Sequence, residues 1–133
     1  MKQTIQRFGG DMKTQKQYLG AFGEDLTLQR YLDDGATLLG RNVRYSVGEI
    51  DLILRSRTGI VIFAEVKTRR GSDFGEADAI DHRKITRMRK AAMKWLEGKP
   101  FTPLRFDVVT VVLDPQTGSP EITIYEDVDH GAR

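Results

Sequence analysis

Two acidic side chains, Asp51 and Glu65, are spaced so that a β-hairpin would bring them together. The runs 49–55 and 60–67 have the composition of strands, and the break between them fits a three-residue loop with Gly59 at its left-handed position. In that register Asp51 lies directly opposite Glu65. Two facing carboxylates repel each other, whereas a bound divalent cation makes the same arrangement favourable. The pair therefore predicts an oxygen-lined site for Mg²⁺ or Mn²⁺.

Two further charged groups fall on the same predicted face. The register places Glu49 opposite Lys67, which follows Glu65 by two residues. An amine there can orient a water molecule and offset the charge of a phosphate, and the Val66 carbonyl supplies another oxygen ligand. In the structural alternative, Glu49 and Lys67 form an ordinary cross-strand pair and the acids face solvent. A one-residue slip would also separate Asp51 from Glu65.

A third acid, Glu24, lies at the edge of an apolar helix face. Apolar residues three, four and seven positions away flank it on a helix predicted over Lys16–Asp33. Two outcomes are equally well supported by this pattern. Glu24 reaches the site of Asp51 as an accessory acid, or it pairs with Arg41 or Arg44.

A second helix, predicted over Asp78–Glu97, carries six basic residues and no acid between positions 83 and 94. Four of them form a stripe at 4-3-4 spacing, with apolar residues on the opposite side. Such a stripe fits phosphate groups, and a solvated basic face is an equally good interpretation. Two arginines that follow the Glu65 strand are expected to extend it. The predicted nucleic-acid contacts are Arg69, Arg70, Arg83, Lys84, Arg87, Lys90 and Lys94.

The elements that must position these residues predict an α/β domain with a mixed sheet. Strand-like runs over Thr37–Tyr45, 49–55 and 60–67 are separated by turn residues, which indicates an antiparallel meander. The run Phe106–Leu113 is almost continuously apolar, as in a strand buried on both faces, and is expected at the centre of the sheet. The run Glu121–Tyr125 would be an edge strand. The predicted order is α-β-β-β-α-β with one short strand added.

Length and composition exclude several classes of function. A chain of 133 residues is about one domain, with a flexible arm over 1–15, the domain over 16–125 and a frayed tail over 126–133. The absence of cysteine excludes disulfides, thiolate zinc sites and cysteine nucleophiles. The net charge of +2 does not by itself indicate nucleic acid. No apolar run reaches the length of a signal peptide or a membrane span, so a soluble cytoplasmic protein is expected.

Several residues outside the acidic cluster have structural interpretations. Asp107 follows Arg105 by two positions inside the apolar run, and an internal ion pair between them is favoured over a catalytic role. Trp95 and Phe106 are expected in the core rather than as platforms for bases. His82 lacks a partner at metal-ligand spacing and is expected on the surface.

Segments between Tyr18 and Leu113 resemble the pattern of the bacterial YraN family: Gly23-Glu24, Arg41-Asn42-Val43-Arg44, Gly48-Glu49-Ile50-Asp51-Leu52-Ile53, Glu65-Val66-Lys67-Thr68-Arg69 and Arg105-Phe106-Asp107. That family is similar to the PD-(D/E)XK nucleases, especially to the branch of the archaeal Holliday junction resolvases. The resemblance implies a restriction-endonuclease-like α-β-β-β-α-β core. It also implies that Asp51 is the Asp of the motif, that Glu65-Val66-Lys67 is its E-x-K, and that Glu24 is the helix acid of related nucleases. Thr27 and Ala64 depart from the expected pattern, but neither replaces a catalytic group.

The combined prediction is a metal-dependent endonuclease that acts on DNA, with RNA as the alternative. Asp51 and Glu65 would hold the ion, Lys67 would assist the water and Glu24 would be an accessory acid. Branched or flapped DNA and a homodimer with two sites follow from the resemblance alone. The first alternative is a nucleic-acid-binding accessory protein that keeps the fold and turns over nothing. The second is an interaction domain in which the carboxylates are surface pairs.

Overall fold

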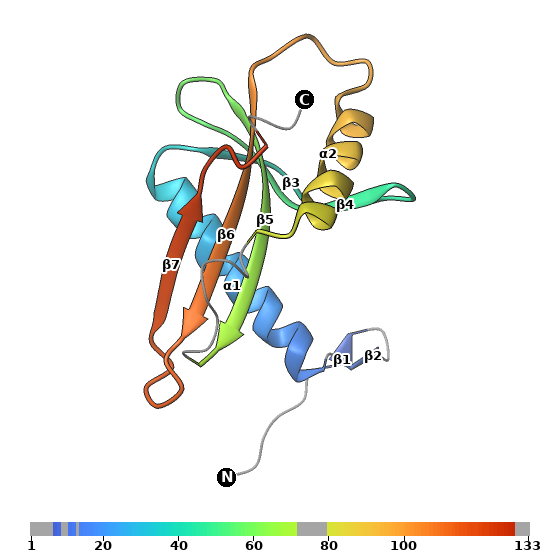
Figure 1. Ribbon diagram of the computed structural model, residues 1–133. Coiled ribbons are helices and arrows are strands. Elements are labelled where there is room, and N and C mark those ends of the chain that lie inside the picture. The colour runs from blue at the N-terminus through green and yellow to red at the C-terminus, as the bar shows by residue number, and fades with distance from the viewer. Residues whose placement is uncertain (1–6, 9–10, 13, 72–79, 130–133) are drawn as a thin grey trace.

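The computed structural model describes residues 7–8, 11–12, 14–71 and 80–129 (Figure 1). Their order along the chain is β1 (Arg7–Phe8), β2 (Asp11–Met12), α1 (Gln15–Asp33), β3 (Thr37–Tyr45), β4 (Gly48–Arg55), β5 (Val61–Arg70), α2 (His82–Leu96), β6 (Leu104–Leu113) and β7 (Pro120–Tyr125). Strands β1 and β2 pair with each other in a separate antiparallel ladder. The other five strands form one sheet.

The five-stranded sheet has the order β3-β4-β5-β6-β7. Strands β5 and β6 are parallel and the other neighbours are antiparallel, so the predicted mixed sheet and β3-β4-β5 meander are confirmed. The prediction that the run 106–113 is the central strand is wrong. Strand β6 is internal, but β5 is in the middle, because β7 adds only one strand beyond β6. Burial on both faces requires packing against both faces of the sheet, which α1 and α2 provide, and does not require the middle position.

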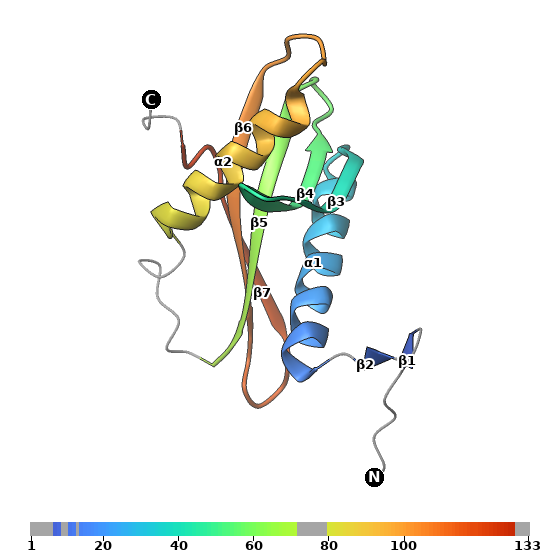
Figure 2. The same cartoon turned by 90° about the vertical axis from the view of Figure 1, so that its right-hand side faces the viewer.

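The two helices cover opposite faces of the sheet (Figure 2). On one face, Leu19, Leu26 and Leu28 of α1 pack against a buried cluster that includes Leu52 and Val109. On the other face, α2 contributes to a second cluster whose buried members are Ile50, Ile53, Val61, Phe63, Met88, Ala91, Ala92 and Phe106. The core therefore lies in two layers with the sheet between them.

The ends of both helices follow from side chains that cap them. Thr14 and Gln17 form a capping box at the start of α1, where the Gln17 N–H donates to the Thr14 hydroxyl and the Gln17 side chain accepts from the Thr14 N–H. The Asp81 carboxylate accepts the N–H groups of Arg83 and Lys84, so α2 begins at His82 and not at the predicted residue 78. A capping aspartate has extended backbone and cannot itself belong to the helix.

The structure describes only part of the predicted arm and of the predicted tail. Much of the predicted arm, 1–15, lies outside the described residues. The predicted tail, 126–133, is described up to Asp129. There the Val128 N–H donates to the Phe106 carbonyl at 2.8 Å, and Val128 packs against the cluster below α2. Neither helix in the described part of the chain has the length and apolarity needed to cross a membrane.

Strand β4 departs from regular alternation at Asp51. Alternation predicts that Ile50 shares a face with Leu52 and Leu54. Ile50 instead packs with Ile53 in the second cluster, on the face that α2 covers. That part of the prediction is wrong. The strand bends at this point, and its first residues continue toward α2 (Figure 1).

Candidate functional site

The predicted hairpin register is confirmed from the loop as far as Leu52 and Ala64. Strands β4 and β5 pair from Arg55 with Val61 to Leu52 with Ala64, and the Ser56 N–H donates to the Ile60 carbonyl at 2.8 Å. Gly59 closes the loop at a φ of +94°. A residue with a Cβ is strained at such a φ, which explains the glycine there.

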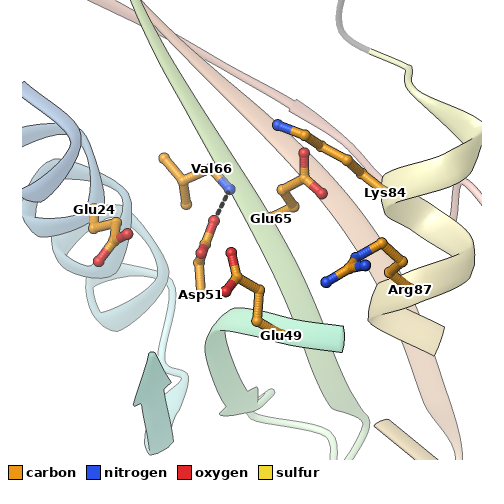
Figure 3. Close-up of a pocket in the computed structure, with 7 residues that line it drawn as sticks. All are labelled: Glu24, Glu49, Asp51, Glu65, Val66, Lys84 and Arg87. Carbon is orange, nitrogen blue, oxygen red and sulfur yellow. Dashed lines mark hydrogen bonds between the residues drawn. The ribbon is translucent and has the colours of Figure 1, made fainter. Parts of the chain in front are cut away.

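Asp51 and Glu65 lie one step beyond the last pair of this ladder. The Asp51 carboxylate accepts the Val66 N–H through Oδ2 at 2.8 Å (Figure 3). This bond replaces the backbone pairing that ends at Leu52. Both acids therefore lie where the β4–β5 ladder ends, and both line the same pocket.

The β4–β5 ladder does not extend to Glu49 and Lys67, which were predicted to face each other. Glu49 pairs instead with Arg44 of β3, and their side chains form an ion pair of 3.6 Å between Nε and Oε2. Both side chains are exposed. The reason is the bend of β4, which directs its first residues away from β5.

A pocket of about 240 Å³ opens at this point. Glu24 of α1 lies on one side, the β-strand acids lie at the base, and two basic side chains of α2 lie on the other side (Figure 3). The residues that line the pocket are Glu24, Glu49, Asp51, Glu65, Val66, Lys84 and Arg87. Most of the predicted catalytic and metal-binding residues are thus gathered in one place, with two of the predicted basic residues beside them.

Burial raises the pKa of Asp51 to about 7 against the opposing effect of the Val66 N–H, and the charges of Glu24, Glu65 and Glu49 raise it further. Burial also raises the pKa of Glu65, while Lys84 and Lys67 lower it. Both carboxylates are held where a negative charge is costly. A cation or a proton in the pocket would relieve this cost.

Glu24 lines the pocket and also pairs with Arg41, so the two positions that its place on the helix left open are compatible. Its side chain is only 15% exposed and lines the pocket. The same carboxylate accepts hydrogen bonds through Oε1 from Arg41 Nε and Asn42 Nδ2, each at 3.3 Å. Arg41 also pairs with Asp25 at 2.8 Å. The predicted pairing with Arg41 is confirmed, and it holds Glu24 beside Asp51 instead of removing it from the site.

Two glycines allow the helices to approach this part of the sheet. A Cβ at Gly23 of α1 would overlap the hydroxyl of Thr68 on β5, and a Cβ at Gly48 of β4 would overlap the carbonyl of Arg87 on α2. Each glycine directly precedes an acid of the pocket, Glu24 or Glu49. The two close contacts therefore determine how near these acids lie to Asp51.

Lys67 is buried, with 7% of its surface exposed. It lies two residues from Glu65 on the same face of β5, and its charge lowers the pKa of Glu65. The described lining of the pocket does not include it. Lys67 therefore acts on the described acids as a nearby charge.

The basic residues predicted to bind nucleic acid separate into two groups. Lys84 and Arg87 line the pocket, and Arg83, Lys90 and Lys94 are exposed along α2. Lys94 also lies 3.8 Å from Glu97. The opposite side of α2 is apolar as predicted, since Ile85, Met88 and Ala92 are buried. The stripe therefore forms one continuous exposed side of the helix that begins at the pocket.

Arg69 and Arg70 are exposed at the end of β5. Because residues alternate along a strand, Arg69 shares the face of Lys67, whereas Arg70 shares the face of Thr68, which α1 covers. Arg70 lines a separate pocket with Tyr18 of α1. Only Arg69 therefore lies on the face that α2 covers.

Within the described residues, no three His, Cys, Asp or Glu side chains lie close enough together to hold a metal ion. The pocket instead offers the carboxylates of Asp51 and Glu65 beside Val66. Mg²⁺ is commonly held by one or two carboxylates together with waters and substrate phosphates. The oxygen donors present fit that mode of binding and do not fit a closed cage made by the protein alone.

The predicted ion pair of Asp107 is confirmed. The Arg105 guanidinium donates from Nε and Nη2 to the two carboxylate oxygens, each at 2.9 Å. Tyr31 Oη and the Asp127 N–H also donate to this carboxylate, at 2.7 and 3.1 Å. Phe106 is buried and Trp95 is half-buried against Phe63, as expected of core residues. Asp107 is fully buried, which supports its structural role.

Asn42 was not identified as a site residue from the sequence. It contacts Glu24 and lies opposite Asp51 in the bent part of β3 and β4. The one sequence feature that could have drawn attention to this position is that Asn42 is the only asparagine in the chain. Asparagine tolerates left-handed backbone better than most residues.

A model of the Uncharacterised protein family UPF0102 matches residues 23–111, which contain all the acids of the pocket and the whole of α2. A UPF0102 protein of Corynebacterium glutamicum is 72% identical over 122 residues, covering 92% of this chain and 100% of the relative. A relative from Corynebacterium diphtheriae is 46% identical over 119 residues, covering 90% and 97% of the two chains. One from Dictyoglomus turgidum is 39% identical over 101 residues, covering 74% and 85%. The resemblance to the YraN pattern is therefore confirmed at the level of the family, and the chain belongs to the Uncharacterised protein family UPF0102.

Proposed function

We propose that this protein is a divalent-metal-dependent endonuclease that hydrolyses phosphodiester bonds of DNA on a restriction-endonuclease-like core. The observation that carries the proposal is the pair Asp51 and Glu65, two partly buried carboxylates that line the same pocket. Basic side chains of α2 border the same pocket. Acids that attract a cation, next to bases that attract phosphate, are the arrangement that metal-assisted phosphodiester hydrolysis needs.

Each group of the pocket has a role in this proposal. Asp51, Glu65 and the Val66 carbonyl would hold Mg²⁺ or Mn²⁺, which supplies a water of lowered pKa and a positive charge beside the phosphate. Glu24 adds a carboxylate that can accept a proton or hold a water. Lys84 and Arg87 bind the phosphate and orient it toward the acids.

Lys67 has the most indirect role among the proposed catalytic residues. Its positive charge, together with that of Lys84, partly offsets the burial that raises the pKa of Glu65. A lower pKa favours the ionised carboxylate, which is the form that binds a cation and orients a water. The resemblance to the E-x-K motif supports the further assignment of Lys67 to the attacking water.

DNA is the proposed substrate, and the exposed stripe of Arg83, Lys90 and Lys94 would follow its backbone. Branched or flapped DNA rests on the family resemblance. A homodimer is part of the same proposal, because cutting two strands of a branched substrate needs two pockets.

The test is cleavage of a labelled panel of single strand, duplex, flap and four-way junction with Mg²⁺ or Mn²⁺. The wild type should cut at least one substrate only when metal is present. Asp51→Asn and Glu65→Gln should each abolish cutting, whereas Glu121→Gln on β7, outside the pocket, should cut like the wild type. Metal-independent cutting, or cutting that survives both pocket substitutions, would refute the proposed mechanism.

The second candidate is a nucleic-acid-binding accessory protein with no turnover. The observation in its favour is that no three-residue metal group is present among the described residues. In that case the wild type binds the panel with a steep loss of affinity in salt but cuts none of it. Asp51→Asn would then leave DNA binding unchanged or strengthen it, because it removes a negative charge from a phosphate-facing pocket.

A further inference from the structure

The backbone of Asn42 is in the left-handed region, with a φ of +52°, although the residue lies inside strand β3. In the described chain only one other residue apart from glycine, Asp127, has such a φ. A strand residue ordinarily has a φ near −120° to −140°, so this conformation interrupts the strand. Asparagine is among the few residues with a side chain that adopt it at modest cost.

This interruption lies directly opposite Asp51. Strand β3 pairs Arg41 with Leu52 and Val43 with Ile50, but within these described strands Asn42 is not paired with Asp51. The alternation of β4 also changes at this point, because Ile50 packs on the α2 side together with Ile53. Released from the ladder, Asp51 accepts the Val66 N–H on the side of β5.

The side chain of Asn42 reaches a second acid of the pocket. Its Nδ2 donates to Glu24 Oε1 at 3.3 Å, and Arg41 Nε donates to the same oxygen at 3.3 Å. Asn42 itself does not line the pocket in the described structure. Asn42 can therefore affect the pocket only through the two acids that it neighbours, Glu24 and Asp51.

We propose that Asn42 is a positioning residue that directs two carboxylates into the pocket, Asp51 through its left-handed backbone and Glu24 through its side-chain amide. The geometric claim stands on the fold alone. Its consequence for cation binding rests on the proposed function.

Two variants separate the backbone effect from the side-chain effect. Asn42→Gly keeps the left-handed conformation without strain and removes the amide. Asn42→Ala removes the amide and also disfavours the conformation. The readouts are the NMR signals of the Val66 amide proton and the Glu24 carboxyl carbon without metal, and the affinity for Mn²⁺ by titration.

The two variants should differ in a defined way. Both should shift the Glu24 carboxyl signal, because both lose the amide donor. Only Asn42→Ala should shift the Val66 amide signal, because only there does Asp51 lose its orientation. Mn²⁺ affinity should fall about tenfold or more in Asn42→Ala and less in Asn42→Gly, as expected when a partner that orients a ligand is lost.

Asp127→Gly and Asp127→Ala are the matched controls, since Asp127 has a φ of +56° and its N–H bonds to Asp107. They should change thermal stability without moving either NMR signal or the Mn²⁺ affinity. An Asn42→Ala protein with an unchanged Val66 amide, or an Asp127 variant that moves it equally, refutes the backbone role. An unchanged Glu24 signal in Asn42→Gly refutes the side-chain role.

The experiment also distinguishes this inference from the proposed function. If wild-type protein binds no Mn²⁺ and cuts no DNA, the nuclease proposal fails, and the two NMR signals still decide whether Asn42 orients the acids. If Mn²⁺ binds and DNA is cut but neither signal responds to Asn42→Ala, the nuclease proposal stands and the positioning role is wrong.

Discussion

At the scale of the residue, the partial burial of Asp51 changes the pH at which its carboxyl group titrates. Burial raises its pKa to about 7, from an ordinary value of 3.8. Between these two pH values the folded protein binds a proton that the unfolded chain does not. The free energy of unfolding therefore falls as pH rises from about 4 to about 7, and it stays lowered above that range.

This linkage predicts that Asp51→Asn stabilises the metal-free protein at pH 8. A pKa difference of roughly three units corresponds to about 4 kcal/mol, and the weaker hydrogen bond from the Val66 N–H to a neutral amide reduces the gain to about 2 kcal/mol. Most of the gain should be lost near pH 4, where Asp51 is protonated in the folded protein and partly protonated in the unfolded chain. Denaturant unfolding of both proteins in a chelator at pH 8 and pH 4 measures it. A variant less stable than the wild type at pH 8 would contradict the burial cost assigned to Asp51.

The residue scale also shows which parts of the site were predictable. Asp51 and Glu65 were placed together because strand alternation and a three-residue loop leave one register. The role of Asn42 was not predictable, because a left-handed residue inside a strand is a local exception that spacing does not reveal. The same exception explains why Ile50 was assigned to the wrong face.

At the scale of the element, the contact between α1 and β5 determines where Glu24 lies. Gly23 has no side chain at the point where α1 crosses Thr68, and the buried Thr68 hydroxyl has no hydrogen-bond partner among the described residues. The backbone of α1 lies so close to Thr68 of β5 that no room is left for a side chain at Gly23. Any side chain at Gly23 must therefore move α1 outward and take Glu24 with it.

Gly23→Ala is predicted to destabilise the protein by about 1–3 kcal/mol, because the new methyl group overlaps Thr68. Gly20→Ala is the matched control in the same helix, since a Cβ at Gly20 meets nothing within 4 Å. It should leave stability unchanged or raise it by about 0.5–1 kcal/mol through helix propensity. Thermal and denaturant unfolding of both variants test this, and equal effects at the two glycines would show that the close contact is not tight.

The helices also show the limit of pattern-based boundaries. The amphipathic pattern of α2 predicted its basic and apolar sides correctly, yet it began the helix at residue 78. The helix cannot start earlier, because the Asp81 carboxylate accepts the N–H groups of Arg83 and Lys84 and so makes Asp81 the N-cap. Several acidic residues precede the helix, and periodicity does not identify which of them is the cap.

At the scale of the whole molecule, the net charge of +2 is small, but its distribution is uneven. The acids of the pocket gather at one end of the exposed basic stripe, which continues along α2. Under the proposed function, affinity for DNA should therefore depend on a few phosphate contacts and not on overall charge.

This distribution predicts that Arg83→Ala and Lys90→Ala each weaken DNA binding and reduce the slope of log affinity against log salt by about one. Arg30→Ala is the matched control, because Arg30 lies on α1 in an exposed pair with Asp34. It should change neither the affinity nor the slope. Fluorescence anisotropy between 50 and 200 mM salt measures all three variants, and an equal response to Arg30→Ala would mean that binding follows net charge.

The sequence by itself determined the α/β class, the β3-β4-β5 meander, the register that brings Asp51 to Glu65, and the two sides of α2. Each of these depends on local periodicity or on a short turn, which neighbouring residues specify. The tertiary structure decided that β5 is the middle strand, that Glu24 and Arg87 reach the same pocket from opposite faces, and that β4 bends at Asp51. These features depend on contacts between residues distant in the chain, such as Gly23 with Thr68, which become visible only when the helices pack on the sheet.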